Sequence, residues 1–412
     1  MIATDPLWVP TRCAGLARLA DFLPRAGRDY ADRRNFDFGP ADRSNVSGLS
    51  PYLRHRLVTE QEVVQAVIER HGVRVAEKFL AETCWRTYWK GWLEQRPGVW
   101  SSYRSEVRAG LDSLDHDSSL RDRFEATTTG HSGIECVDLW TRELVEHGYL
   151  HNHARMWFAS LWIFTLKLPW ALGADFFLRH LIDGDPASNT LSWRWVAGLQ
   201  TKGKTYRASP ENIARFTEGR IQPREAFASH AEPVEGSPIP PIRPLPAAER
   251  FDPRQPFALL LTEEDLAIES LEISAKSPVE VAGMLANDRS ELWAGAPARD
   301  FVRGALGDAL ERAGSWFGVP GVNLDRAAGE AIVAWATGLN VKQVITPFTP
   351  VGPAREQLNR NEAMLKKAGI RLIQVRRGWD DELWPHATAG YFGFKKNLEP
   401  SLARLGVFAG SR

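Results

Sequence analysis

Several features that identify common protein classes are scarce in this 412-residue chain or missing from it. Its three cysteines, Cys13, Cys84 and Cys136, lack the spacing of a metal site or a disulfide framework, so we expect a reducing compartment. Lysine plus arginine and aspartate plus glutamate both total 51, so any site for a polyanion must be a local patch. No stretch reaches about 18 uninterrupted apolar residues, and the first residues lack the pattern of a leader peptide. These absences predict a cytoplasmic protein with no metal and no membrane partner.

A proline-rich segment divides the chain. Residues 229–256 contain eight prolines and little apolar periodicity, which is the composition of a stiff, extended linker. Before it, apolar residues recur at spacings of three and four, which predicts an all-helical domain over residues 1–228. After it, short apolar runs alternate with amphipathic helices, which predicts a Rossmann-like α/β domain with a mostly parallel sheet over residues 257–412.

The periodicity also predicts individual elements. The segment from Met156 to Leu168 is apolar on every side and should form a buried central helix. The second domain has no G-x-G-x-x-G sequence after its first strand and no P-loop, so no motif supports a nucleotide site there. The helices expected before the linker cover residues 58–72, 75–96, 137–148 and 153–168; after it we expect strands at 257–261, 342–348 and 371–377 and helices at 298–314, 325–338 and 355–369.

The residues best suited to chemistry lie in the first half, which holds 11 of the 16 tryptophans. The densest group is DGDPASNTLSWRW, at residues 183–195. Two acids, a carboxamide and two indoles could form a ligand site, or an Asx-rich loop could cap a helix whose tryptophans lie in the core. The residues in question are Asp183, Asp185, Asn189, Trp193 and Trp195.

Three clusters upstream carry similar side chains. GYLHNHARMW places Asn152, Arg155 and Met156 on one helical face, and AETCWRTYW places Glu82 and Trp85 one turn apart. NVSGLSPYL opens a helix whose hydroxyls and amides could hold an anion at Ser47, Leu49 and Ser50. The alternatives are a structural ion pair for the first cluster, core packing for the second and helix capping for the third.

Taken in this order and spacing, these sequences resemble the FAD-binding domain of the cryptochrome/photolyase family over about residues 12–220. The resemblance implies FAD as cofactor, with its phosphates on Ser47, Leu49 and Ser50. Asp183 and Asp185 would hydrogen-bond the flavin and ribose, Arg155 would pair with Asp183, and Asn189 would face flavin N5. The segments that carry the resemblance are Tyr30 with Arg34, SGLSPYL, FLAETCWR (which includes Arg86), SGIECVD, GYLHNHARM, LPWALGADFFLRHLIDGD and NTLSWRW.

The resemblance also implies a substrate pocket for a flipped pyrimidine dimer. Trp85 and Trp195 would be its stacking walls, Glu82 and Asn152 would hydrogen-bond the dimer, and Met156 would pack against it. The (6-4) branch of the family has histidines where this chain has Asn152 and Met156, which favours the cyclobutane dimer.

An electron relay to the flavin is implied as well. Trp193 and Trp170 match its first two members, whereas the third would fall near Asp117, which cannot carry an electron hole. Trp100 and Trp140 are the alternatives, between which spacing does not choose. Six bases against two acids between residues 200 and 224 form either a solvated face or a rim that contacts DNA phosphates: Lys202, Lys204, Arg207, Arg215, Arg220 and Arg224.

The domain order departs from the family, in which an antenna domain usually precedes the FAD domain. FALLLTEEDLAIESLEI resembles the first strand and acidic turn of that antenna domain, so the chain resembles a circular permutation of the family. We expect the second domain to dock on the first, and the flavin site to be built wholly from residues before the linker. Whether a second, antenna chromophore binds stays open.

The activity implied is that of a deoxyribodipyrimidine photolyase, a lyase. Excited FADH⁻ would donate an electron to the flipped dimer in single- or double-stranded DNA, the ring would split and the electron would return. The alternative is a cryptochrome-like blue-light photoreceptor or signalling flavoprotein without repair, and a third is a redox flavoprotein that works in the dark. The retained pocket residues favour repair, and the permuted order favours the photoreceptor.

Overall fold

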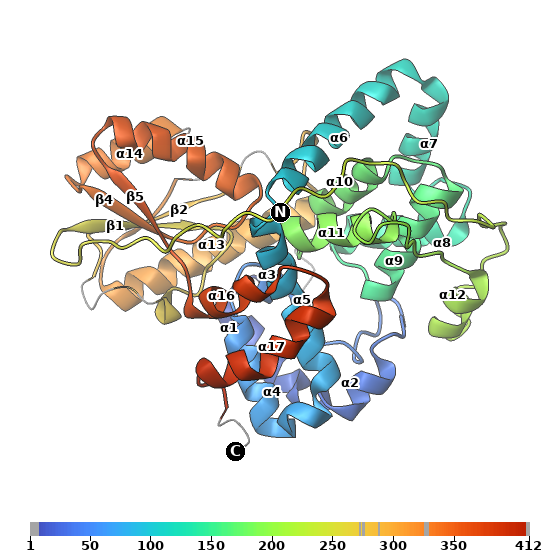
Figure 1. Cartoon of the computed structure of the whole chain (residues 1–412), viewed down its shortest axis with the longest axis horizontal. Coiled ribbons are helices and arrows are strands. Elements are labelled where there is room, and N and C mark those ends of the chain that lie inside the picture. The colour runs from blue at the N-terminus through green and yellow to red at the C-terminus, as the bar shows by residue number, and fades with distance from the viewer. Residues whose placement is uncertain (1–7, 272, 274–276, 287–288, 325–328, 409–412) are drawn as a thin grey trace.

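The computed structural model of the chain describes residues 8–271, 273, 277–286, 289–324 and 329–408. A helical part comes first, an α/β part follows, and residues 221–256 between them contain no helix or strand (Figure 1). Within the described residues, no helix combines the length and the apolar composition that a membrane span requires.

The expected helices of the first part are confirmed, with ends shifted by a few residues. A capping box explains where α4 begins, because Thr59 Oγ1 accepts from the Glu62 amide while the Glu62 carboxylate accepts from the Thr59 amide. The helices are α1 (Arg12–Phe22), α2 (Arg28–Arg33), α3 (Ser50–Arg54), α4 (Glu60–Val75), α5 (Glu77–Glu94), α6 (Gly98–His116), α7 (Ser118–Thr128), α8 (Glu135–His147), α9 (Asn152–Ser160), α10 (Trp170–His180), α11 (Pro186–Val196) and α12 (Pro210–Phe216).

The helix expected to reach Leu168 ends earlier. After α9 the chain widens into a π-helical turn over Leu161–Thr165, and Lys167 then adopts a left-handed φ of 55°. Pro169 gives the reason, since a proline disfavours helical backbone in the residue before it. Most apolar residues of this segment are buried, as the sequence predicts, whereas Met156 and Leu166 are partly exposed.

The second part has a five-stranded, wholly parallel sheet of order β3-β2-β1-β4-β5, which confirms the predicted fold class. Its strands are β1 (Phe257–Thr262), β2 (Val281–Met284), β3 (Gly321–Asn323), β4 (Gln343–Pro347) and β5 (Arg371–Val375). The sequence did not predict β2 and β3, which have only four and three residues. The helices are α13 (Ala296–Phe317), α14 (Gly329–Gly338), α15 (Pro353–Lys367), α16 (Gly378–Leu383) and α17 (Tyr391–Arg404); the start of the helix expected from 325 lies outside the described residues.

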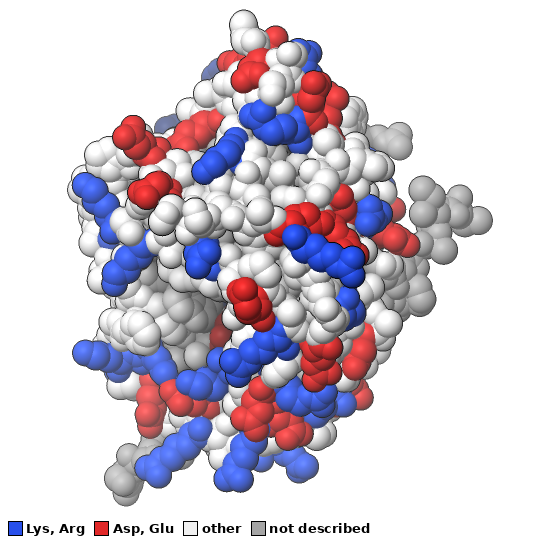
Figure 2. Space-filling model, turned by 90° about the vertical axis from the view of Figure 1, so that its right-hand side faces the viewer, with Lys and Arg blue, Asp and Glu red and all other residues white. Residues whose placement is uncertain are grey.

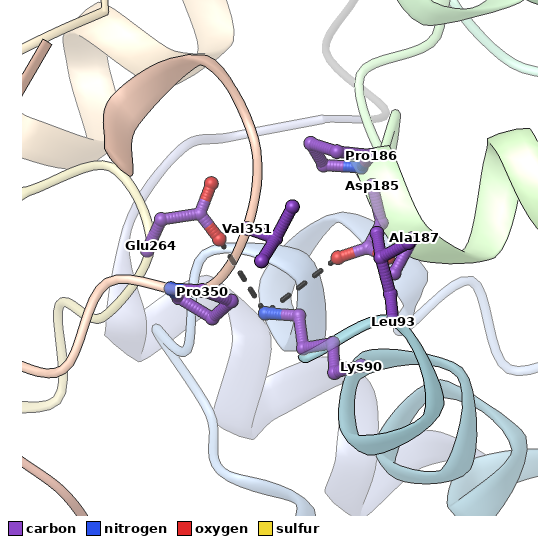
Figure 3. Close-up of a pocket in the computed structure, with 8 residues that line it drawn as sticks. All are labelled: Lys90, Leu93, Asp185, Pro186, Ala187, Glu264, Pro350 and Val351. Atoms are coloured by element: carbon purple, nitrogen blue, oxygen red, sulfur yellow. Dashed lines mark hydrogen bonds and ion pairs between the residues drawn. The ribbon is translucent and has the colours of Figure 1, made fainter. Parts of the chain in front are cut away.

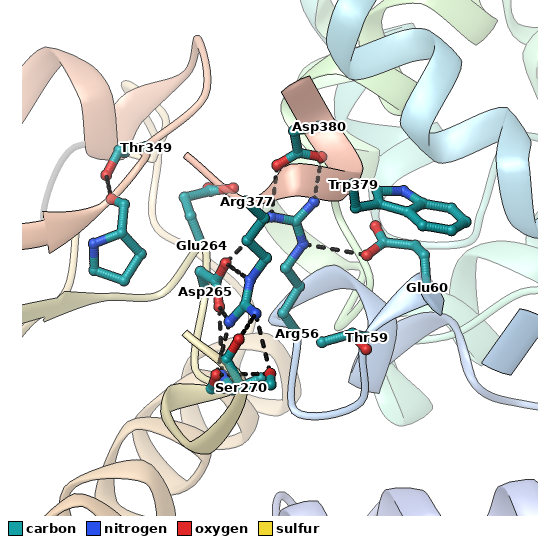
Figure 4. Close-up of polar contacts among 12 residues, drawn as sticks. Arg56, Thr59, Glu60, Glu264, Asp265, Ser270, Thr349, Arg377, Trp379 and Asp380 are labelled. Atoms are coloured by element: carbon teal, nitrogen blue, oxygen red, sulfur yellow. Dashed lines mark hydrogen bonds and ion pairs between the residues drawn. The ribbon is translucent and has the colours of Figure 1, made fainter. Parts of the chain in front are cut away.

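The α/β part packs against the helical part, as expected. The strand order reverses beside β1, and the chain leaving the carboxyl end of β1 meets the helical part there. In Figure 4, buried Arg56 bonds to Asp380 at 2.7 and 2.8 Å, to Asp265 at 3.1 Å and to Glu60 at 3.2 Å. One apolar core runs through both parts, so the division at residues 228 and 257 into separate domains stays a proposal.

Candidate cofactor and substrate site

Asp183 lies in the turn between α10 and α11 and forms the predicted ion pair with Arg155. Arg155 Nη2 donates to Asp183 Oδ2 at 2.8 Å, and Arg155 Nε donates to the Leu150 carbonyl at 2.9 Å. Burial alone would raise the pKa of Asp183, but Arg155 outweighs it and the pKa is lowered. Asp183 Oδ1 is buried without a hydrogen-bond partner in the described structure, so an acceptor remains for a ligand.

Asp185 serves first as the cap of α11. Its Oδ1 accepts from the Ser188 amide at 2.7 Å, while Oδ2 lies 3.5 Å from Lys90 Nζ and 3.6 Å from Arg86 Nη1. Burial would raise the pKa of Asp185, but these cations keep it well below its usual range. The helix-capping interpretation is therefore realised here, and the predicted contact with ribose stays a prediction.

A small cavity adjoins Asp185 where the two parts meet (Figure 3). Lys90 bridges Asp185 and Glu264 across it, with the Glu264 carboxylate at 3.4 Å. The cavity leaves no room for even a water-sized sphere, so it is not itself a place for a dinucleotide. The lining includes Glu264, Pro350 and Val351 from beyond the linker, whereas the expectation that the flavin site itself is built wholly from earlier residues stays a prediction.

The predicted phosphate segment lies against the same acids. Ser47 Oγ accepts from the Leu49 amide at 3.3 Å, and Leu49 is 1% exposed. Ser50 opens α3; its hydroxyl helps to lower the pKa of Asp183, and its carbonyl accepts from Arg86 at 3.4 Å. The structure thus brings the loop, Asp183 and Arg86 together.

Tyr30, Arg34 and Glu82 form the next group. Arg34 Nε lies 3.9 Å from Glu82 Oε1, and Tyr30 packs edge-on against Phe79 with ring centroids 5.0 Å apart. The Glu82 side chain is 43% exposed, yet desolvation by surrounding protein raises its pKa. A side chain that is partly exposed and yet surrounded by protein lies in a concave part of the surface, and such a position suits a pocket.

The predicted substrate residues come from three helices, of which α11 packs against both α5 and α9. Glu82 and Trp85 lie on α5, Asn152 and Met156 on the first two turns of α9, and Trp195 on α11. Asn152 is exposed, and Met156, Trp85 and Trp195 are partly exposed.

Aromatic neighbours cover part of both proposed walls. Trp195 stacks on Tyr206 with ring centroids 5.7 Å apart, and the Tyr206 hydroxyl lies 3.4 Å from His153 Nε2. Trp85 stacks on Tyr391, which comes from the far end of the chain. His153 Nδ1 also bonds the Asn35 carbonyl at 3.0 Å.

The residues proposed for the electron relay, Trp193 and Trp170, are buried on α11 and α10. Asn189 donates from Nδ2 to the Ala174 carbonyl at 2.7 Å, which sets the orientation of its amide. Trp193 packs edge-on against Phe177 at 5.1 Å, and Trp170 lies 5.8 Å from Tyr103.

The aromatic path continues beyond Trp170. Tyr103 lies 5.1 Å from Trp100, so Trp170, Tyr103 and Trp100 form a continuous series of rings. Trp140 instead stacks on Trp157 at 5.7 Å, and Asp117 caps α7. The structure therefore favours Trp100 over Trp140 as the third member.

The basic residues between 200 and 224 are all exposed, and Arg220 alone among them makes a described ion pair, with Asp37 at 3.0 Å. Figure 2 views the molecule from the right-hand side of Figure 1, and this face has a hollow with Lys and Arg side chains along its lower rim.

Sequence reasoning missed several residues of this region. Lys90 follows Arg86 by one turn of α5, and this spacing could have placed both cations on one face. Arg54, buried between Glu264 and the Gly184 carbonyl, and Tyr391 carried no such signal, because their partners lie more than 100 residues away.

Part of the chain is similar to known proteins. Residues 79–220 match the model of the FAD binding domain of DNA photolyase. A deoxyribodipyrimidine photo-lyase of Streptomyces griseus is 32% identical over 255 residues, which are 58% of this chain and 53% of that protein. One of Thermus thermophilus is 32% identical over 207 residues, 49% of this chain and 46% of that protein. The solved structure of a class III photolyase from Agrobacterium tumefaciens is 29% identical, with a TM-score of 0.40, covering 52% of this chain and 44% of that one.

Residues 79–220 thus match an FAD-binding domain of the photolyase type, and the cofactor of this domain is FAD. The matches support the cryptochrome/photolyase family. The chain spans about half the length of the curated relatives it matches.

The donor set fits this cofactor. Asp183 Oδ1, Arg86 Nη1 and Ser188 Oγ are buried without hydrogen-bond partners in the described structure. A flavin offers N–H donors and carbonyl acceptors, and its ribityl and pyrophosphate groups offer hydroxyls and anionic oxygens. An acceptor, a guanidinium nitrogen and a hydroxyl without hydrogen-bond partners in one region are the groups that such a molecule would satisfy.

Proposed function

We propose that this protein uses blue light and bound FAD to split cyclobutane pyrimidine dimers in DNA. One observation carries the proposal: residues suited to a flipped dimer come from three packed helices, α5, α9 and α11, and α11 also carries the residue proposed to face the flavin, Asn189. A base taken out of the duplex needs aromatic walls and polar partners at its edge.

The pocket residues supply both kinds of contact. Trp85 and Trp195 would stack on the dimer, and Met156 would pack against it. The Glu82 carboxyl can hydrogen-bond the polar edge of a pyrimidine, accepting from an N–H when ionised and donating to a carbonyl when protonated. Asn152, exposed at the start of α9, can both donate and accept.

The cofactor residues would orient the flavin beside this pocket. When bound and reduced, FAD supplies the light-driven electron, and the protein supplies orientation, electrostatics and exclusion of water. Ser47, Leu49, Ser50 and Arg86 would hold the phosphate side, whereas Asp183, with Arg155 behind it, would accept from a flavin N–H. The remaining members are Tyr30, Arg34, Asp185 and Asn189.

The basic segment would contact the DNA backbone. Lys204 and Arg207 flank Tyr206, which stacks on Trp195, so exposed cations adjoin one proposed wall. Because phosphate contacts release counterions, replacing Lys202, Lys204 and Arg207 with Gln should flatten the salt dependence of DNA binding.

The decisive test is blue-light repair of an irradiated oligonucleotide by the purified, reduced holoprotein, measured as thymine monomers recovered against a dark control. Trp85→Ala should keep flavin but weaken binding to dimer-containing DNA about 5- to 150-fold, the range expected for a lost stacking wall. Trp316→Ala, which removes an indole that is 61% exposed, is the matched control and should bind like the wild type. Equal wild-type affinity for damaged and undamaged DNA, with no monomers recovered, would refute repair.

A second candidate, a blue-light photoreceptor, is favoured by the end of the aromatic path. Trp100 Nε1 donates to Glu356 Oε1 of α15 at 2.6 Å, so an electron hole on Trp100 would change a contact between the two parts. Under this candidate, light should alter hydrogen exchange in α15, and Trp85→Ala should not matter.

A further inference from the structure

The segment from α16 into α17, residues 378–395, lies along α5, as their neighbouring positions in Figure 1 indicate. We call this segment the C-terminal clamp. Its side chains and carbonyls meet α5 at successive turns from Gln95 back to Glu77. The bonds are Trp379 Nε1 to Thr87 Oγ1 at 3.0 Å, Gln95 Nε2 to the Trp384 carbonyl at 3.0 Å, Tyr88 Oη to the Ala389 carbonyl at 2.7 Å, Tyr391 Oη to the Ala81 carbonyl at 2.8 Å and Lys395 Nζ to Glu77 Oε1 at 2.5 Å.

Gly91 indicates how closely the clamp fits. A Cβ atom on Gly91 would lie 2.8 Å from the Trp384 ring and 2.9 Å from its Cα, closer than real Cβ contacts allow. Trp384 is fully buried, so neither partner can move aside cheaply. A residue of α5 is therefore matched to one nearly 300 positions later in the chain.

The clamp meets the proposed substrate wall at Tyr391. The rings of Trp85 and Tyr391 are stacked, with centroids 3.6 Å apart and an interplanar angle of 11°. The other ring neighbours of Trp85 are tilted or edge-on, with Trp89 at 5.3 Å and Tyr88 at 5.5 Å. Tyr391 is only 7% exposed and bonded to α5 through its hydroxyl, so it is a rigid support rather than a mobile cover.

We propose that Tyr391 is a positioning residue: it holds Trp85 in the orientation whose remaining exposed surface stacks on a flipped dimer. The inference rests on the proposed function. An unsupported indole must lose its rotamer freedom when the dimer binds, whereas a ring already stacked has lost it beforehand. The α/β part would thus complete the substrate site whether or not it holds a chromophore.

The test uses the full-length, FAD-loaded protein and a fluorescent oligonucleotide with or without one dimer. Tyr391→Ala should weaken dimer binding about 2- to 12-fold, the range of an aromatic pair, and leave undamaged DNA unaffected. Tyr391→Phe keeps the ring and should restore most of the affinity. Phe392→Ala, which changes the adjacent side chain of α17 that is 82% exposed, is the matched control and should bind like the wild type.

A double-mutant cycle separates positioning from a general loss of stability. In a Trp85→Ala background, Tyr391→Ala should cause no further loss of dimer affinity, because the wall that it supports is already absent. Additive losses, or unchanged or tighter dimer binding in Tyr391→Ala, would overturn the inference; tighter binding would make Tyr391 an occluding group instead.

A spectroscopic readout keeps the two proposals distinguishable. Near-ultraviolet circular dichroism is measured in the absence of DNA. The spectral change caused by Tyr391→Ala should be much smaller in the Trp85→Ala background than in the wild-type background. Equal changes in the two backgrounds would overturn the positioning role. If Trp85→Ala binds dimer DNA like the wild type, the proposed substrate site fails, whatever the spectra report of the stacked pair.

Discussion

Asp183→Asn tests the flavin site at a buried charge. The substitution keeps the shape of the side chain but removes the carboxylate that Arg155 contacts at 2.8 Å and whose Oδ1 has no partner in the described structure. Because the side chain is 3% exposed, water cannot replace a lost contact with the flavin. A hydrogen bond to a charged group is worth about 1.5–3 kcal/mol, so FAD should bind about 10- to 150-fold more weakly. Fluorescence titration of FAD into the apoprotein in the dark measures this change.

Asp175→Asn is the matched control. Asp175 also has a side chain that is 3% exposed, and it also pairs with an arginine, Arg179, at 2.9 Å, but it lies outside the proposed site. Both variants should lose stability, since each leaves a buried guanidinium without its countercharge. Only Asp183→Asn should lose flavin affinity. Wild-type affinity in Asp183→Asn, or an equal loss in Asp175→Asn, would refute the assignment.

Three further outcomes are expected. Arg56→Met leaves three buried carboxylates without their shared cation and should lower the free energy of unfolding by about 3–5 kcal/mol. At an unfolding entropy of about 2.1 cal/mol/K per residue, this loss lowers Tm by about 4–6 °C. The control Arg254→Met removes an exposed ion pair and should lower Tm by less than about 1 °C. Burial raises the pKa of Asp380 and Arg56 lowers it, so this pKa should rise further in Arg56→Met. The loss in free energy of unfolding caused by Arg56→Met should therefore become smaller as the pH falls and Asp380 is protonated. A loss that stays constant from pH 8 to 5 would contradict this. Trp100→Phe should slow light-driven reduction of the bound flavin, followed by absorbance, whereas Trp140→Phe should not; the reverse order would favour Trp140 as the third relay member.

The sequence by itself determined the local elements and the family. Apolar spacing is a property of neighbouring residues, so helices such as α5 and α15 and the strand β1 could be predicted before any contact was known. The strands β2 and β3 could not be predicted, because their four and three residues are too few to show a periodic pattern. The Arg155–Asp183 pair was predicted only because both residues belong to sequences that resemble the family.

Only the tertiary structure decided which distant segments of the chain meet beside the proposed site. Arg56 meets Asp380, Lys90 meets Glu264 and Trp85 meets Tyr391 across separations of more than 170 residues. No periodicity records such contacts, because they depend on how packed layers bring distant segments together rather than on local backbone preference. The sequence therefore located the proposed flavin and substrate residues, while folding determined that the α/β part neutralises the cations beside them and supports the indole among them.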